Sequence, residues 1–250
     1  MYEHLANSKG KKVIADTLAV SGSTIQGHTQ RNHTYDKIKS KNWNYVVIQG
    51  FSREFARDSA TIAISSIPFT KMLIDSIKKY NPCVNIYYYM TWGYANGFTD
   101  SIPNDTYQSM QERIQSGYLQ LSNATGKFPI APVGMVWKQL REQYPELNLY
   151  NSDNAHPNPV GSYVAACTFF SSIYKESPLN GAHPSKIEQV LAQKVQECAN
   201  NYVLSNVAKF NLDTVQGVVT KIINPKIGMS VNTKWLSISV KSVDHLKGKH

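Results

Sequence analysis

Residues 151 to 170 read NSDNAHPNPVGSYVAACTFF and place a carboxylate and an imidazole close together, at Asp153 and His156. In a catalytic triad, a histidine takes the proton of a nucleophile while a carboxylate holds its other nitrogen. An Asp three residues before a His can reach the ring within one loop, and the surrounding Asn, Ser and Pro residues are typical of a loop. The spacing alone is equally compatible with an Asp that caps the apolar helix predicted from Pro159, beside an incidental His.

The elements that would position this pair alternate along the chain. Apolar and β-branched runs predict strands, and amphipathic runs predict helices. The strands are expected at 11–20, 42–50, 83–93 and the start of 127–145. The helices are expected at 58–82, with a break or restart at Pro68, at 104–126, in the rest of 127–145, and after the Asp153 loop.

Alternating strands and helices predict a mostly parallel sheet with helices on both faces. Ligands of such sheets bind beyond the carboxyl ends of the strands. Four connections therefore carry the candidate site residues, since each follows a strand or joins elements at one edge. They hold Gly22, Gln49 with Ser52, Trp92 with Asn96, and Asp153 with His156.

The character of the sequence changes toward its end. An amphipathic helix is predicted beyond residue 184, and the segment from 209 to 250 is rich in lysine. Residues 232–243 alternate apolar and polar side chains, which is typical of a half-exposed strand. We interpret residues 1–206 as one α/β domain and residues 207–250 as a basic extension, either an accessory hairpin or a partly ordered tail.

Composition excludes several classes of protein. The net charge is +9, but the basic residues are spread along the chain, so a nucleic-acid partner is not expected. Cys83, Cys167 and Cys198 are widely spaced in apolar settings, which favours buried free thiols over disulfides or a zinc site. The sequence has no apolar run of about 20 residues that could span a membrane and no motif for a metal or nucleotide cofactor.

The segment DNAHPNPVGSYVAAC resembles the last conserved block of the SGNH (GDSL-type) hydrolases, where an Asp-x-x-His pair precedes the final helix. The likeness covers most of residues 1–178. WNYVVIQGFS, YYYMTWGYANG and PIAPVGMVW are similar to segments of a branch common in gut bacteria, which carries a Gln in place of the usual oxyanion Asn. The resemblance implies a three-layer α/β/α, flavodoxin-like fold. Members of this family are often secreted or periplasmic, although the polar opening MYEHLANSKGKK is unlike a signal peptide.

The resemblance also implies roles for the candidate residues. His156 would shuttle the proton, Asp153 would orient it, and Gly22 and Gln49 would help to hold an oxyanion. A glycine in a turn and a hydrogen-bonded glutamine at a strand end would equally account for the last two without catalysis. Ser52, Trp92 and Asn96 would lie on neighbouring loops and contact the substrate.

The sequence departs from the family at its start. MYEHLANSKG is similar to the helix that follows the nucleophile, so the first strand and the serine turn are not seen in this sequence. A substitute such as Ser21, Ser23 or Ser52, an upstream block, or a true loss of catalysis would each account for this. The gap in the sheet would then be filled by a partner, a swapped strand, or the chain's own strand at 232–243.

The resemblance favours a serine hydrolase of acyl esters, such as acetylated carbohydrate, that needs no cofactor. The rival interpretation is a catalytically inactive domain that binds a glycan or a protein in the same crevice.

Overall fold

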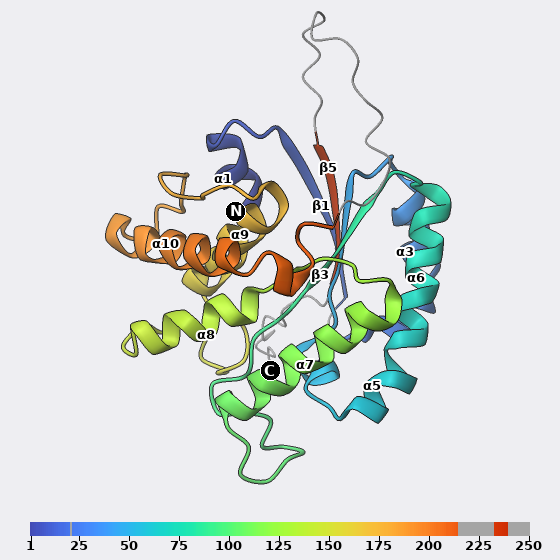
Figure 1. The fold of residues 1–250 in the computed structure, drawn as a ribbon, viewed down its shortest axis with the longest axis horizontal. Coiled ribbons are helices and arrows are strands. Elements are labelled where there is room, and N and C mark those ends of the chain that lie inside the picture. The colour runs from blue at the N-terminus through green and yellow to red at the C-terminus, as the bar shows by residue number, and fades with distance from the viewer. Residues whose placement is uncertain (21, 215–232, 240–250) are drawn as a thin grey trace, which may run out of the picture.

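The computed structural model describes residues 1–20, 22–214 and 233–239 of the chain. They form three layers, in which a five-stranded sheet lies between two sets of helices (Figure 1). The predicted α/β class and the mostly parallel sheet are confirmed, because every pair of neighbouring strands is parallel. The strands are β1 (Val13–Ala19), β2 (Tyr45–Ile48), β3 (Asn85–Tyr89), β4 (Ile130–Ala131) and β5 (Thr233–Ser239).

The central strands are buried on both faces, as expected for a sheet covered on each side. Val46 and Val47 of β2 and Ile86 of β3 are fully shielded from solvent. One helical layer contains α1 (Tyr2–Ser8), α8 (Val133–Gln143), α9 (Pro159–Tyr174) and α10 (Gln189–Ser205). The other contains α3 (Asn32–Lys39), α5 (Ser59–Ser65) and α6 (Ile67–Tyr80), with α7 (Tyr107–Thr125) packed on α5 and α6.

Local signals in the sequence account for several helix ends. Pro68 lies in the first turn of α6, where a missing N–H costs nothing, and it separates α5 from α6. Gly126 ends α7 in the left-handed conformation, with φ of 110°. The short helices α2 (Ile25–Thr29) and α4 (Ser52–Phe55) and the 3-10 turn Ala208–Phe210 complete the set. Among the described helices none is long and apolar enough on its own to cross a membrane, although the bent pair α5 and α6 together meets that length and composition.

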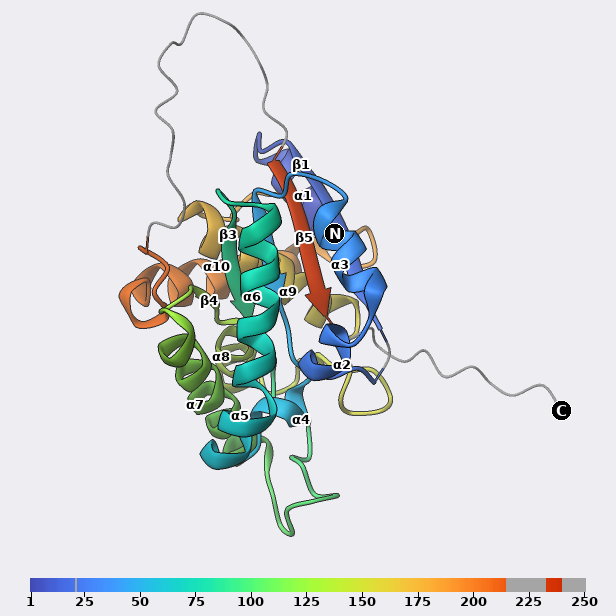
Figure 2. The same cartoon turned by 90° about the vertical axis from the view of Figure 1, so that its right-hand side faces the viewer.

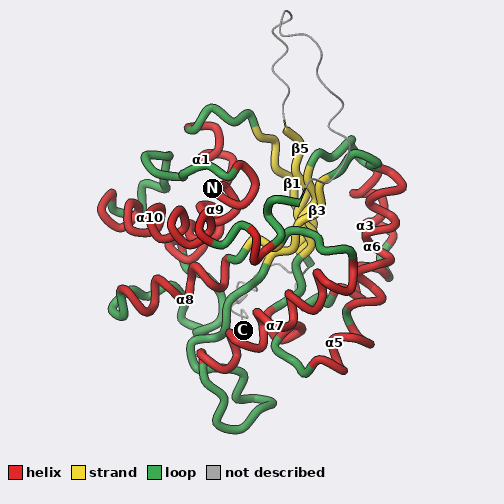
Figure 3. Tube along the Cα trace, viewed as in Figure 1, coloured by secondary structure: helices red, strands yellow, loops and turns green. Residues whose placement is uncertain are grey.

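The most distant pairing in the sheet involves the end of the chain. The strand order is β1-β5-β2-β3-β4, so β5 lies between β1 and β2. Figure 3 shows β5 within the central sheet, beside β1. Leu236 is in register with both Asp16 and Val46. The strand that we expected in an accessory hairpin is therefore an interior strand of the main sheet. Of the three ways to fill the gap, the structure has the chain's own tail; residues 215–232 and 240–250 of the predicted extension lie outside the described residues.

The cysteines follow the prediction in part. Cys167 and Cys198 are buried free thiols, and burial raises the pKa of both; that of Cys198 reaches about 12. Cys83 is exposed, in the turn between α6 and β3. Its apolar neighbour Val84 is buried just before β3, whereas the side chain of Cys83 faces solvent.

The interior position of β5 predicts a strong effect of proline. In Leu236→Pro, the lost N–H and the fixed φ disrupt a ladder with neighbours on both sides. We expect the free energy of unfolding to fall by about 1–3 kcal/mol, because a backbone carbonyl inside the sheet is left unpaired, measured by urea denaturation. Leu236→Ala is the control, since it shortens the side chain and keeps the backbone donor. Equal losses in the two variants would contradict an interior strand at this position.

Candidate active site

Asp153 and His156 form a hydrogen-bonded pair in the loop before α9. The Asp153 Oδ2 to His156 Nδ1 distance is 2.5 Å, and Asp153 Oδ1 accepts the backbone N–H groups of Ala155 and His156, each at 2.9 Å. Partial burial opposes ionisation of Asp153, but these hydrogen bonds outweigh it and lower its pKa. The carboxylate is thus held ionised against the imidazole, with the geometry that a triad histidine requires.

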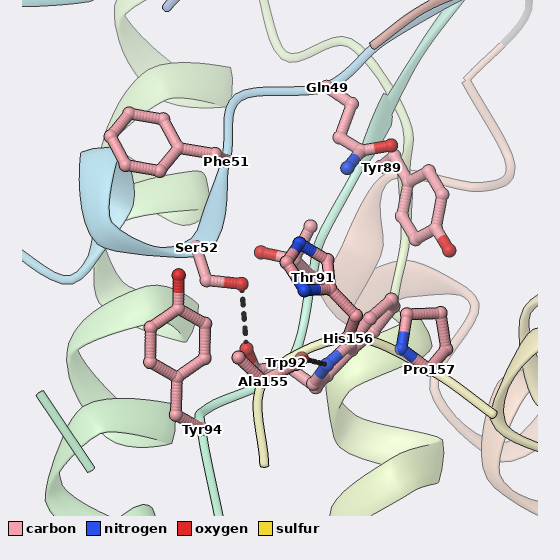
Figure 4. A pocket seen from close by; sticks show the side chains of 10 residues that line it. All are labelled: Gln49, Phe51, Ser52, Tyr89, Thr91, Trp92, Tyr94, Ala155, His156 and Pro157. Atoms are coloured by element: carbon pink, nitrogen blue, oxygen red, sulfur yellow. Dashed lines mark hydrogen bonds between the residues drawn. The ribbon is translucent and has the colours of Figure 1, made fainter. Parts of the chain in front are cut away.

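His156 faces a small cavity at the carboxyl edge of the sheet. The cavity holds about 200 Å³. Its walls come from the ends of β2 and β3, the start of α4 and the His156 loop, and Figure 4 shows the side chains that line it. The lining residues are Gln49, Phe51, Ser52, Tyr89, Thr91, Trp92, Tyr94, Ala155, His156 and Pro157. Among the described residues, His156 Nε2 has no hydrogen-bond partner, so it is available to a ligand.

The loop after β3 holds the His156 loop in place. The indole Nε1 of Trp92 donates to the carbonyl of Ala155 at 2.9 Å, and the N–H of Ala95 donates to the carbonyl of Asn154 at 2.9 Å. From the other direction, the hydroxyl of Tyr150 donates to Gly93 O at 2.7 Å. These three hydrogen bonds connect the loop after β3 to the loop that carries His156.

Trp92 is itself fixed by packing. Its ring stacks on Trp137 of α8, with centroids 4.4 Å apart and planes 6° apart, and it is 7% exposed. Only an edge of Trp92 therefore reaches the cavity. We predicted Trp92 as a substrate contact, and the structure adds a support role through Ala155.

Ser52 lies in the cavity wall, but its hydroxyl is engaged. Ser52 Oγ donates to the carbonyl of Trp92 at 2.8 Å (Figure 4). Ser23 is also occupied, because its Oγ accepts from Arg31 at 2.7 Å. Ser21 lies outside the described residues. Among the hydroxyls of residues 1–20 and 22–214, none is hydrogen-bonded to His156 Nε2.

Gln49 directly follows β2 and brings an amide to the cavity. In Figure 4 its side chain points toward the space beside His156 and Thr91. The amide makes no hydrogen bond with any of the described residues, although it is half-buried. A half-buried amide facing a cavity without a protein partner is suited to a polar ligand. The alternative of a structural hydrogen bond for Gln49 has no counterpart among the described contacts.

Two predicted residues do not line the cavity. Gly22 has φ of 66°, so the turn after β1 uses the backbone freedom of glycine, and the next described element is α2. Asn96 is exposed in the turn before Gly97. Neither Gly22 nor Asn96 belongs to the cavity wall, whereas Gln49, Ser52, Trp92 and His156 do.

Tyr89, Thr91 and Pro157 are among the lining residues that were not predicted as site residues. Tyr89 and Thr91 lie at the carboxyl end of β3, in the run YYYMTWG. The same strand-end rule that selected Gln49 would have included them, but an aromatic run in a strand is also typical of a core. Pro157 follows His156 directly and has no chemical signal of its own.

A buried carboxyl group lies on α4, two residues after Ser52 of the cavity wall. Glu54 of α4 is 5% exposed, and both of its oxygens are 3.3 Å from the N–H of Ile25 at the start of α2. Ser66 Oγ also donates to it at 3.1 Å. Burial raises the pKa of Glu54 to about 7, although the bonds from Ile25 and Ser66 and the charge of Arg57 oppose this. Glu54 therefore links α2, α4 and the start of α6.

The described part of the chain has no cluster of side chains suited to binding a metal ion. No group of three or more His, Cys, Asp or Glu side chains gathers there with the geometry of a metal site. The Asp153–His156 pair has the partner and spacing of a proton-transfer pair instead.

Comparison with known proteins places the chain in a family. A family model described as Domain of unknown function (DUF4886) matches residues 4–205. The fold is similar to the crystal structure of a DUF4886 family protein from Bacteroides uniformis ATCC 8492. That similarity has a TM-score of 0.72 at 18% identity and covers 87% of this chain and 91% of that one. No curated protein matches the sequence.

The raised pKa of Glu54 predicts a pH-dependent cost to stability. The pKa of Glu54 is near 4.5 in the unfolded chain and about 7 in the folded protein. The folded protein therefore loses stability as pH rises between these two values. The loss amounts to about 3 kcal/mol at pH 8. In Glu54→Gln this loss should vanish, so the variant gains stability over the wild type as pH rises from 5 to 8, measured by urea denaturation. The exposed Glu146→Gln is the control; parallel pH profiles for wild type and Glu54→Gln would contradict the assignment.

Proposed function

This chain belongs to the DUF4886 family, and we propose that it is an SGNH-type serine hydrolase of acyl esters. One observation carries the proposal. An ionised Asp153 holds Nδ1 of His156 at 2.5 Å, while Nε2 of the same ring faces a cavity without a partner among the described residues. This is the arrangement of a general base that waits for a hydroxyl group.

The chemistry would follow the triad scheme. Nε2 of His156 takes the proton of a serine hydroxyl as the oxygen attacks the acyl carbonyl, and Asp153 stabilises the imidazolium. The proton then passes to the leaving alcohol, and water releases the acyl group by the same route. The amide N–H of Gln49 would donate to the oxyanion, since its side chain points into the cavity without a protein partner.

The cavity favours a small acyl group on a larger alcohol. Its volume of about 200 Å³ suits a group such as acetyl, and Phe51 and Tyr94 are aromatic residues of its lining. Aromatic faces pack well on the apolar faces of sugar rings. An acetylated carbohydrate is therefore the substrate class that we propose.

Sheet topology points to a serine within the chain. β5 ends at Ser239, which is in register with Ala19 of β1, and the preceding Ile238 is in register with Ile48 of β2. The backbone of Ser239 thus lies at the carboxyl edge, between β1 and the strand that leads to Gln49. We propose Ser239 as the first candidate for the nucleophile.

A second function has an observation in its favour. The hydroxyls of Ser23 and Ser52 are engaged with Arg31 and with the carbonyl of Trp92, and none of the described hydroxyls reaches His156 by a hydrogen bond. A domain that binds an acetylated glycan without cleaving it would keep the same cavity. The two functions differ in whether a serine becomes acylated.

Hydrolysis of p-nitrophenyl acetate tests the proposal, with a fluorophosphonate probe and mass mapping of the label. We expect His156→Gln and Asp153→Asn each to lower kcat/KM roughly a thousandfold and Gln49→Ala to lower it about a hundredfold. Ser239→Ala should abolish both labelling and turnover. The exposed His33→Gln is the matched control and should leave the rate unchanged.

The outcomes separate the two functions. Labelling at a different serine would keep the hydrolase and reject Ser239. Absence of both turnover and labelling, in a protein that still binds an acetylated oligosaccharide, would reject the hydrolase and support the binding domain.

A further inference from the structure

The lysines of this chain gather at one end of the fold, although they are scattered in the sequence. All strands are parallel, so their amino ends share one edge of the sheet, opposite the candidate active site. The connections that reach this edge carry lysines. We call this surface the lysine edge, and it comprises Lys9, Lys11, Lys12, Lys37, Lys39, Lys41, Lys78, Lys79, Lys127 and Lys175.

The element ends show how the fold assembles this surface. Figure 2 shows β5 pointing away from this edge, while α6 runs toward it. Lys37 and Lys39 lie in the last turn of α3, and Lys78 and Lys79 in the last turn of α6. Contacts between distant segments confirm the convergence, since Lys9 Nζ donates to the carbonyl of Leu179 at 2.9 Å.

Few carboxylates compensate this charge. Glu176 pairs with Lys11 at 2.6 Å, and Asp16 pairs with Lys37 at 2.8 Å and Lys41 at 3.3 Å. Asp75 lines a shallow groove with Lys39 and Lys79, and Asp213 lies near Lys175. Lys12 and Lys127 are exposed and have no ion pair or ring contact with the described residues.

Helix stability explains only part of the pattern. Lysines in the last turn of a helix favour its dipole, which accounts for those of α3 and α6. Lys12 precedes β1, Lys41 precedes β2 and Lys127 precedes β4, and all three lie beyond the last helical residue of the element before them. Helix stability therefore does not account for the positive charge at the starts of three strands, and we infer an anionic partner outside the chain.

The type of cation distinguishes between polyanions. The lysine edge has no arginine, whereas Arg53 and Arg57 follow β2 at the opposite edge. Arginine is the usual donor to nucleic-acid bases and phosphates, through paired hydrogen bonds, whereas lysine acts as a point charge. Tyr80 is 38% exposed between Lys39 and Lys79, whose ammonium groups lie 5.1 and 5.5 Å from its ring. Exposed aromatic rings beside lysines are typical of surfaces that contact lipid head groups.

We propose that the lysine edge binds the anionic head groups of a lipid bilayer. The attraction is electrostatic, and it adds up over lysines that reach the same plane. The orientation suits the candidate active site, because the cavity beside His156 lies at the opposite edge and stays open to solvent. The proposal is independent of the proposed hydrolase activity.

Co-sedimentation with vesicles tests this proposal. Vesicles of phosphatidylglycerol and phosphatidylcholine should bind the protein, vesicles of phosphatidylcholine alone should not, and binding should weaken as salt rises. The triple variant Lys12→Glu/Lys79→Glu/Lys127→Glu should lower the partition coefficient roughly a hundredfold or more. The matched control Lys71→Glu/Lys138→Glu/Lys194→Glu makes the same charge change on α6, α8 and α10, away from the strand starts.

Each outcome decides the matter. A loss confined to the first triple variant, with its thermal unfolding unchanged, supports the lysine edge. Equal losses in both triple variants would mean that vesicle binding depends on net charge alone, which would overturn the proposal of a specific lipid-binding surface. Binding to duplex DNA with no binding to anionic vesicles would overturn the lipid assignment in favour of a nucleic-acid partner.

Discussion

The sheet depends on backbone hydrogen bonds between β5 and its two neighbours. β1 and β2 are both paired with β5, and they are not paired with each other. Without a strand between them, the inner N–H and C=O groups of both would lose their partners in a buried sheet. The sheet therefore joins the first and last described strands of the chain, which are separated by more than two hundred residues. Closing so long a loop costs conformational entropy before the contacts between the strands can offset that cost.

The candidate site follows from this arrangement, because its parts come from different strand ends. Gln49 follows β2 and Trp92 follows β3, while His156 arrives on a loop that belongs to neither strand. The loop is held by Trp92 and Ala95 from one direction and by Tyr150 from the other. The close packing of α9 supports it further, since a Cβ at Gly161 would lie 2.4 Å from the carbonyl of Leu149. The imidazole is therefore positioned by tertiary hydrogen bonds and packing as well as by its own turn.

The sequence predicted the elements well where the signals are local. The apolar run Val46 to Ile48, the proline at 68 and the glycine at 126 each act within a few residues, and each is found in the expected element. The Asp153–His156 contact was also a local prediction, because three residues separate the partners. The position of β5 was not predictable in this way, since alternation at 232–243 is the same for an edge strand and an interior strand. Asn96 and Gly22 show the same limit, because a position at a strand end does not decide whether a residue reaches the cavity.

The distribution of cations shows why topology matters more than sequence spacing here. Arg53 ion-pairs with Asp100 at 2.7 Å, and Arg113 with the buried Asp105 at 2.6 Å, so these two arginines are paired within the fold. These bonds brace the loop that carries Trp92, because Asp105 also accepts the N–H of Phe98. At the starts of the strands, Lys12 and Lys127 are exposed and have no ion pair with the described residues, whereas Lys11, Lys37 and Lys41 pair with carboxylates. A parallel sheet collects every strand start at one edge, so one basic residue per connection is enough to charge that whole surface. The two edges of one sheet thereby acquire different characters, one braced around a cavity and the other rich in lysine.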